Sequence, residues 1–148
     1  MDSQVIRLLL ADDDKDDRVL FIDALDELSL PVVLETAEDG EALMKLLNQQ
    51  KNKLPDILFL DLNMPRKNGF ECLSEIKRAD RLVDLPVIIF STSFDQDIVE
   101  MLYKKGALHY IRKPNEFEKL KTAINKALGS IEKGTGTFVA PENFVLQY

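Results

Sequence analysis

The stretch of residues 57–69, with the sequence ILFLDLNMPRKNG, constrains the fold more than any other part of the chain. Four apolar residues lead directly to Asp61, and Pro65 and Gly69 then turn the chain away. A short run that is apolar throughout and bounded by turn residues is typical of a strand buried on both faces of a sheet. We therefore expect Asp61 to stand at the carboxyl end of a central strand, where open α/β sheets bind their ligands.

The rest of the chain alternates between apolar runs and segments with helical spacing. Further strands are predicted over residues 5–11, 32–37, 87–90 and 108–111. Helices are predicted from an N-cap at Asp14 to about Ser29, over 41–50 and 69–79, from a cap near Asp95 to Gly106, and over 115–128. The side chains expected on the buried face of the first helix are Leu20, Phe21, Ala24 and Leu28. This alternation predicts an α/β fold with a parallel sheet covered on both faces.

Length and composition fit a single globular domain of 148 residues. A net charge of −7 argues against direct binding to nucleic acid or to an anionic membrane surface. Cys72 is the only cysteine, so an intrachain disulfide cannot form, and we expect a cytoplasmic protein with Cys72 in the core. No apolar stretch approaches the length of a membrane span. His109, the only histidine, is interpreted as structural.

Polar side chains follow four of the predicted strands at the point where each strand ends. These residues are Asp12 and Asp13, Asp61, Ser91 and Lys113. Because the carboxyl ends of parallel strands lie on one edge of the sheet, these residues are predicted to form a single site.

The predicted site has the chemistry of phosphoryl transfer. Three carboxylates on one edge repel each other unless a cation joins them, and their hard oxygens suit Mg²⁺. The carboxylate of Asp61 can act as a nucleophile and form an aspartyl-phosphate. Mg²⁺ and the Lys113 ammonium would offset charge on the phosphoryl group, and Ser91 would donate a hydrogen bond to it.

Simpler interpretations exist for each of these residues taken alone. The acidic run 12–17 also suits a solvated turn followed by a helix N-terminus, and Ser91 could cap the next helix. Lys113 could be an ordinary surface lysine in a loop. Their shared position after buried strands favours the site. An aspartate-nucleophile phosphohydrolase is an alternative function, although Asn63 stands where such enzymes usually place a second acid. Gly-rich nucleotide-binding motifs do not occur in the sequence.

Four motifs in the right order resemble the receiver domain of two-component response regulators. They are LADDD at residues 10–14, DLNMPRKNG at 61–69, FSTS at 90–93 and YIRKP at 110–114. The resemblance covers residues 4–128, and is greatest for stand-alone receivers such as the regulators partnered with bacterial phytochromes. It implies a flavodoxin-like, doubly wound sheet of five strands in the order 2-1-3-4-5 with five helices.

The resemblance also implies a role for each residue of the site. Asp61 would accept the phosphoryl group from a histidine kinase or a phosphotransfer protein. The groups that would hold Mg²⁺ are the carboxylates of Asp12, Asp13 and Asp61 and the backbone carbonyl of Asn63. Ser91 would move towards the phosphate, Lys113 would pair with it before a cis peptide bond at Pro114, and Tyr110 would be an aromatic switch.

Such a protein is a signalling module and not an enzyme, apart from Mg²⁺-dependent self-phosphorylation and slow autodephosphorylation. Phosphorylation would alter the face formed by the fourth helix, fifth strand and fifth helix, and so its affinity for a downstream protein. A homodimer through that face or through the C-terminal tail is also expected. A scaffold of the same fold that works without phosphorylation is a second alternative.

The tail, residues 129–148, is too short for a separate output domain. Gly129 is predicted to end the last helix, and residues 129–136 are predicted to be a flexible linker. The apolar side chains beyond the linker are Phe138, Phe144, Val145, Leu146 and Tyr148. We expect them to dock on the domain or on a second copy, because exposing so many apolar groups is costly.

Overall fold

The structure is a computed structural model that describes residues 5–49, 53–132 and 139–148. Within these residues, five β-strands alternate with five α-helices. The strands are β1 (Ile6–Ala11), β2 (Val32–Ala37), β3 (Ile57–Leu60), β4 (Val87–Ser91) and β5 (His109–Arg112). The helices are α1 (Lys15–Leu28), α2 (Gly40–Gln49), α3 (Gly69–Arg78), α4 (Gln96–Lys104) and α5 (Phe117–Glu132), followed by a 3₁₀ turn, η1 (Pro141–Asn143).

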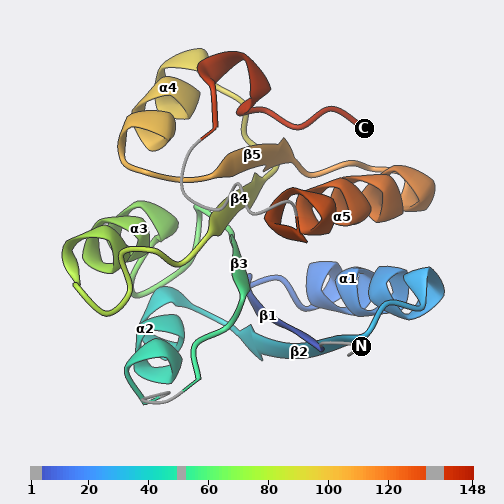
Figure 1. The fold of residues 1–148 in the computed structure, drawn as a ribbon, viewed down its shortest axis with the longest axis horizontal. Helices are drawn as coiled ribbons and strands as arrows, with labels where there is room; N and C mark the ends of the chain where they lie inside the picture. Colours follow the sequence, from blue (N-terminus) through green and yellow to red (C-terminus); the bar gives the residue numbers. More distant parts are fainter. Residues whose placement is uncertain (1–4, 50–52, 133–138) are drawn as a thin grey trace.

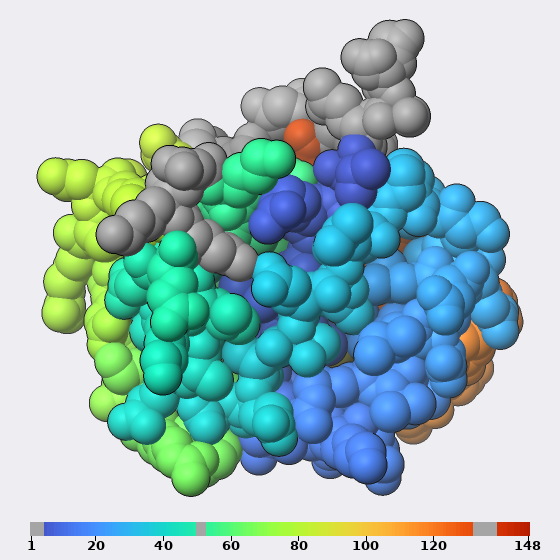
Figure 2. All heavy atoms as spheres, turned by 90° about the horizontal axis from the view of Figure 1, so that it is seen from below, coloured from blue at the N-terminus to red at the C-terminus, as the bar shows by residue number. Residues whose placement is uncertain are grey.

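The five strands form one parallel sheet in the order β2-β1-β3-β4-β5, which confirms the predicted fold and strand order. Helices α1 and α5 cover one face of the sheet, and α2, α3 and α4 cover the other (Figure 1). Figure 2 looks onto the β2 edge, with α1 and α2 on either side. None of the helices in the described ranges is both long and apolar enough to cross a membrane.

Helix α1 begins where the sequence predicts, but its buried face differs from the prediction. The Asp14 side chain accepts a hydrogen bond from Asp17 N, as expected for an N-cap. Phe21 and Ala24 are buried against the sheet, whereas Leu20 is 46% exposed. The prediction for Leu20 is therefore wrong, because it lies to one side of the stripe that meets the sheet.

The last helix is longer than predicted. It continues through Gly129 to Glu132, so the prediction that Gly129 ends it is wrong. Glycine weakens a helix interior, but here the following turn is held by a tertiary contact, because Ser130 Oγ lies 3.0 Å from His109 Nε2. Residues 133–136 of the predicted linker, and Phe138, lie outside the described residues.

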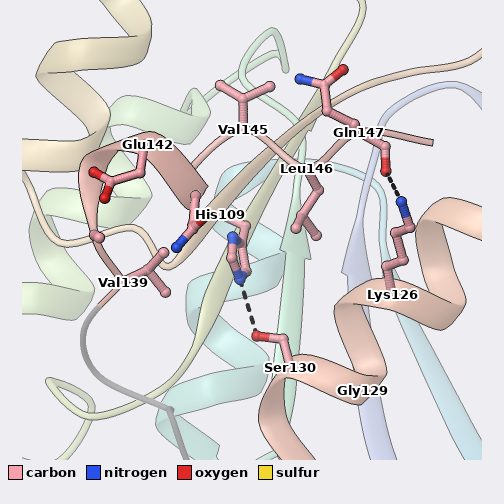
Figure 3. Close-up of a pocket in the computed structure, with 11 residues that line it drawn as sticks. His109, Lys126, Gly129, Ser130, Val139, Glu142, Val145, Leu146 and Gln147 are labelled. Carbon is pink, nitrogen blue, oxygen red and sulfur yellow. Dashed lines mark hydrogen bonds between the residues drawn. The ribbon is translucent and has the colours of Figure 1, made fainter.

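The end of the chain docks on the open edge of β5 (Figure 3). Val145 pairs with Tyr110 in parallel, Tyr110 N donates to Phe144 O at 3.0 Å, and Leu146 N donates to Tyr110 O at 3.0 Å. The Phe144 side chain is 2% exposed and its ring centroid lies 5.2 Å from that of Tyr103. The tail therefore protects an edge strand and closes the core beside α4.

His109 joins the tail to α5 and has the structural role predicted for it. Its Nδ1 lies 3.1 Å from Phe144 O, which can only accept, so Nδ1 carries the hydrogen and Nε2 accepts from Ser130 Oγ (Figure 3). Burial lowers the pKa of His109 below 6.5, although hydrogen bonds to the backbone of residues 143 and 144 oppose this.

Truncation of Phe144 tests the docking of the tail. Phe144→Ala removes a buried ring, so we expect the free energy of unfolding to fall by about 3–5 kcal/mol in urea denaturation. Gln147→Ala, at an exposed position in the same segment, is the control and should change stability by less than about 0.5 kcal/mol. Equal stability of the two variants would contradict the docked arrangement.

The lowered pKa of His109 predicts a dependence of stability on pH. The unfolded chain takes up a proton near pH 6.5 more readily than the folded chain, so the contribution of His109 is complete above that pH. It is lost as the pH falls from 6.5 towards the pKa in the folded protein. Urea denaturation at pH 7.5 and 5.0 should show a larger loss for wild type than for His109→Gln. Equal losses would contradict the prediction.

Candidate functional site

Two acidic residues are placed side by side by the hydrogen-bond ladder of the sheet. Asp12 N donates to Ala37 O at 3.0 Å, and Asp61 N donates to Ala11 O at 3.0 Å. Each bond extends a strand pair by one residue beyond the strand end. Because β1 and β3 are neighbours, the Asp12 and Asp61 side chains leave the same edge of the sheet together.

A glycine allows the start of α3 to pack directly behind Asp61. Gly69 N donates to Leu62 O at 2.9 Å. A Cβ at residue 69 would lie 2.2 Å from the backbone oxygen of Asp61, which is closer than any side chain allows. The close approach fixes the loop between β3 and α3, and so the position from which the Asp61 carboxylate projects.

Carboxylate oxygens of Asp12, Asp13 and Asp61 lie within 4.8 Å of one another. Asp12 and Asp61 are buried, whereas Asp13 is exposed. Burial raises the pKa of Asp61 to about 6, although the nearby Lys113 ammonium opposes this shift. Burial also raises the pKa of Asp12, against hydrogen bonds from Lys113 and from Asp14 N. The positive charge of Lys113 therefore does not fully offset the cost of burying the negative charges of Asp12 and Asp61.

Lys113 supplies the only cation in direct contact with these buried carboxylates among the described residues. Its backbone N donates to Ser91 O at 2.8 Å, which fixes the residue at the end of β5. Its Nζ lies 2.8 Å from Asp12 Oδ2, 2.8 Å from Asp17 Oδ2 and 3.3 Å from Asp61 Oδ2. Burial lowers the pKa of Lys113, but hydrogen bonds to Asp12 and Asp17 outweigh it and leave the pKa raised.

Ser91 and Tyr110 are joined in a hydrogen-bonded group beside the site. Ser91 is fully buried, and its Oγ accepts from Ser93 N at 3.2 Å. The Tyr110 ring is fully buried and its hydroxyl donates to Ser93 O. Burial raises the pKa of Tyr110, while a hydrogen bond with the Ser91 side chain opposes this. Phe94 covers the ring edge-on, with centroids 5.8 Å apart.

The structure thus brings together Asp12, Asp13, Asp61 and Lys113, and places Ser91 on the adjacent strand. Asn63 is exposed in the loop after β3, and the role of its carbonyl stays a prediction. The expected cis peptide bond before Pro114 is wrong: every described peptide bond is trans, the lower-energy form, and Lys113 reaches the site without a cis bond.

Sequence reasoning missed Asp17 as a partner of Lys113. In the sequence it is only one member of the acidic run 12–17, and its position in the first turn of α1 is explained by the helix dipole alone. The signal that could have found it is its place in the first turn of a helix that begins directly after the site. A carboxylate there lies close enough to the edge of the sheet to meet a lysine from the end of β5.

Carboxylate oxygens this close together, two of them buried, form a suitable set of ligands for a divalent cation such as Mg²⁺ or Mn²⁺. A buried carboxylate beside a lysine ammonium is also a suitable acceptor of a phosphoryl group.

The fold and the site together match a known family. The response regulator receiver domain model matches residues 8–125, and the chain belongs to this family. It is 32% identical over 122 residues to the probable methanogenesis regulatory protein FilR2 of Methanothrix harundinacea, covering 80% of this chain and 79% of FilR2. It is 33% identical over 117 residues to the response regulator Rcp1 of Synechocystis, covering 76% of this chain and 80% of Rcp1.

Solved structures give the same assignment. The structure of the phosphorylated cyanobacterial phytochrome response regulator RcpA matches with a TM-score of 0.78 and 32% identity, over 90% of this chain and 98% of RcpA. The Mn²⁺-bound form of Rcp1 matches with a TM-score of 0.75 and 31% identity, over 91% of this chain and 99% of Rcp1. This chain is therefore a receiver domain of two-component signalling.

The raised pKa of Asp61 predicts that this carboxylate destabilises the metal-free fold at neutral pH. Because the pKa in the folded protein, about 6, exceeds the ordinary value of 3.8, wild type gains stability as the pH falls through 6. At pH 7.5 without divalent cations, Asp61→Asn should raise the free energy of unfolding by about 1–3 kcal/mol, and the gain should shrink at pH 5.

Asp13→Asn is the matched control, because it removes the same charge from an exposed position at the same edge. Urea denaturation should show a change of less than about 0.5 kcal/mol for this variant. An Asp61→Asn protein no more stable than Asp13→Asn at pH 7.5 would contradict the predicted destabilisation.

Proposed function

We propose that Asp61 accepts a phosphoryl group from a partner histidine kinase or phosphotransfer protein in a Mg²⁺-dependent reaction. One observation carries the proposal: the carboxylates of Asp12, Asp13 and Asp61 gather within 4.8 Å, with the Lys113 ammonium 3.3 Å from Asp61. A nucleophile, the ligands for a divalent cation and a fixed positive charge therefore share one edge of the sheet.

The reaction is a displacement at phosphorus. One oxygen of Asp61 forms the new O–P bond while the bond from phosphorus to the donor atom breaks, and that atom keeps the electron pair. The donor atom is a nitrogen for a phosphohistidine and an oxygen for acetyl phosphate. Lys113 offsets charge on the transferred group. Its backbone does not have to move to do so, because Lys113 N already donates to Ser91 O at 2.8 Å.

The groups that would hold the metal are the carboxylates of Asp12, Asp13 and Asp61 and the backbone carbonyl of Asn63. Mg²⁺ would supply positive charge to the phosphate oxygens and help to orient them. Asp12 is held ready by Asp14 N, which donates to its Oδ1 at 3.0 Å, and by Arg18, whose Nη1 donates to the Asp12 carbonyl at 2.8 Å.

Phosphorylation would act as a switch through the residues next to the site. An added charge of about −1.5 to −2 attracts Lys113 and the Ser91 hydroxyl. Ser91 shares hydrogen bonds with Ser93 N and with Tyr110, so its movement alters the packing of Tyr110. The face that responds is formed by α4, β5 and α5.

The partner of that face is a downstream protein. A homodimer through the same face or through the tail is part of the proposal. The protein acts in the cytoplasm, without direct binding to nucleic acid or membrane. Its own chemistry is limited to Mg²⁺-dependent self-phosphorylation and slow autodephosphorylation.

Acetyl phosphate tests the phosphoacceptor directly. With Mg²⁺, intact-mass spectrometry of wild type should show the gain of one phosphoryl group, and peptide mapping should locate a base-labile adduct on Asp61. Asp61→Asn should gain none, because an amide is a poor nucleophile. Chelation of Mg²⁺ should lower the rate of phosphorylation by more than about tenfold.

Asp39→Asn is a control, because Asp39 is an acid outside the site that pairs with Arg66 at 3.1 Å. This variant should be phosphorylated like wild type. Phosphorylation of Asp61→Asn at the wild-type rate would overturn the proposal, and rapid turnover of unrelated phosphoesters by wild type would favour a hydrolase instead.

A further inference from the structure

One of the three carboxylates around Lys113 lies outside the proposed metal site. Asp17 Oδ2 is 2.8 Å from Lys113 Nζ, as close as Asp12 and closer than Asp61. The carboxylates that gather within 4.8 Å are those of Asp12, Asp13 and Asp61, and Asp17 is not among them. Asp12 and Asp61 therefore contact Lys113 and are also proposed metal ligands, whereas Asp17 contacts Lys113 but is not a proposed metal ligand.

The position of Asp17 is fixed by the start of α1. Its backbone N donates to Asp14 Oδ1 at 3.1 Å, so the residue is part of the capped first turn. A carboxylate in that turn is also favoured by the helix dipole. The Asp17 side chain is 33% exposed and that of Lys113 is 9% exposed, so their contact lies at the rim, where the buried site meets solvent.

Lys113 and a divalent cation would compete for the carboxylate oxygens of Asp12 and Asp61, and Asp17 reduces that competition. An ammonium group has three N–H donors, and here the carboxylates of Asp12, Asp17 and Asp61 accept one contact each. Without Asp17, Lys113 would have only proposed metal ligands as anionic partners. It would then compete with a divalent cation for Asp12 and Asp61, and its own position would change when the cation bound.

We propose that Asp17 is a positioning residue that holds the Lys113 ammonium on the α1 side of the site. Asp12 and Asp61 can then turn towards a divalent cation while Lys113 stays within reach of a group carried on Asp61. This inference rests on the proposed function, because it concerns the metal and the phosphoryl group of that site.

Metal affinity tests the inference without any phosphorylation. Asp17→Ala and Asp16→Ala each remove one negative charge from the same turn of the same helix, and Asp16 is exposed. In titrations of the full chain with Mg²⁺ and with Mn²⁺ by calorimetry, Asp17→Ala should bind each metal about threefold to tenfold more weakly than Asp16→Ala. Equal affinities of the two variants would overturn the proposal.

A double-mutant cycle shows whether the effect passes through Lys113. When Lys113→Met is combined with each variant, Asp17→Ala and Asp16→Ala should lower metal affinity equally. An excess effect of Asp17→Ala that survives without Lys113 would overturn the positioning role. Circular dichroism identifies variants that do not fold, and Lys113→Gln replaces Lys113→Met if the latter fails.

The kinetics of phosphorylation give a second, independent result. At saturating Mg²⁺, Asp17→Ala should lower the maximal rate of phosphorylation by acetyl phosphate about threefold to tenfold. The concentration of acetyl phosphate that gives half the maximal rate should be unchanged. A change only in the half-saturating concentration, shared by Asp16→Ala, would mean a general charge effect and would overturn the proposal. If wild type gains no phosphoryl group, the proposed function fails, and the metal titrations still decide the role of Asp17.

Discussion

The contact between the Lys113 ammonium and three carboxylates is the interaction on which the rest of the site depends. Burial opposes charge on Asp12 and Asp61, and their raised pKa values express that opposition. One ammonium cannot balance three carboxylates, so the site keeps excess negative charge. That excess makes the site receptive to a divalent cation, and the same Lys113 remains available to an anionic group on Asp61.

The parallel sheet makes it possible to hold charged side chains this close together, because backbone hydrogen bonds fix these residues independently of the charges on their side chains. Asp12, Asp61 and Lys113 each form a ladder hydrogen bond one residue beyond a strand pair, to Ala37 O, Ala11 O and Ser91 O. The strands behind them are buried between two layers of helices, and the rings of Phe21, Phe59 and Phe90 pack edge-to-face on one side. Core packing therefore supplies the stability that the crowded carboxylates remove.

Local patterns in the sequence explain most of the fold and most of the site. The positions of Asp12, Asp61 and Lys113 could be predicted, because an apolar run followed by polar residues marks the end of a strand. The strand order came instead from a family resemblance. Asp17 and the helical turn after Gly129 were not predicted, because each depends on a partner distant in sequence, Lys113 in one case and His109 in the other.

The tail joins the proposed switch to the surface that a partner would meet. Tyr110 contacts Ser91 and Ser93 through its side chain, while its backbone N and O are both bonded to the tail, at Phe144 O and Leu146 N. If the Tyr110 side chain moves, the backbone of the same residue stays hydrogen-bonded to the tail. Because these bonds occupy the open edge of β5, a partner that approaches this edge meets the end of the chain before it meets the strand. The tail is thus part of the face that we propose to respond to phosphorylation, and its hydrogen bonds to β5 would oppose any rearrangement of that face.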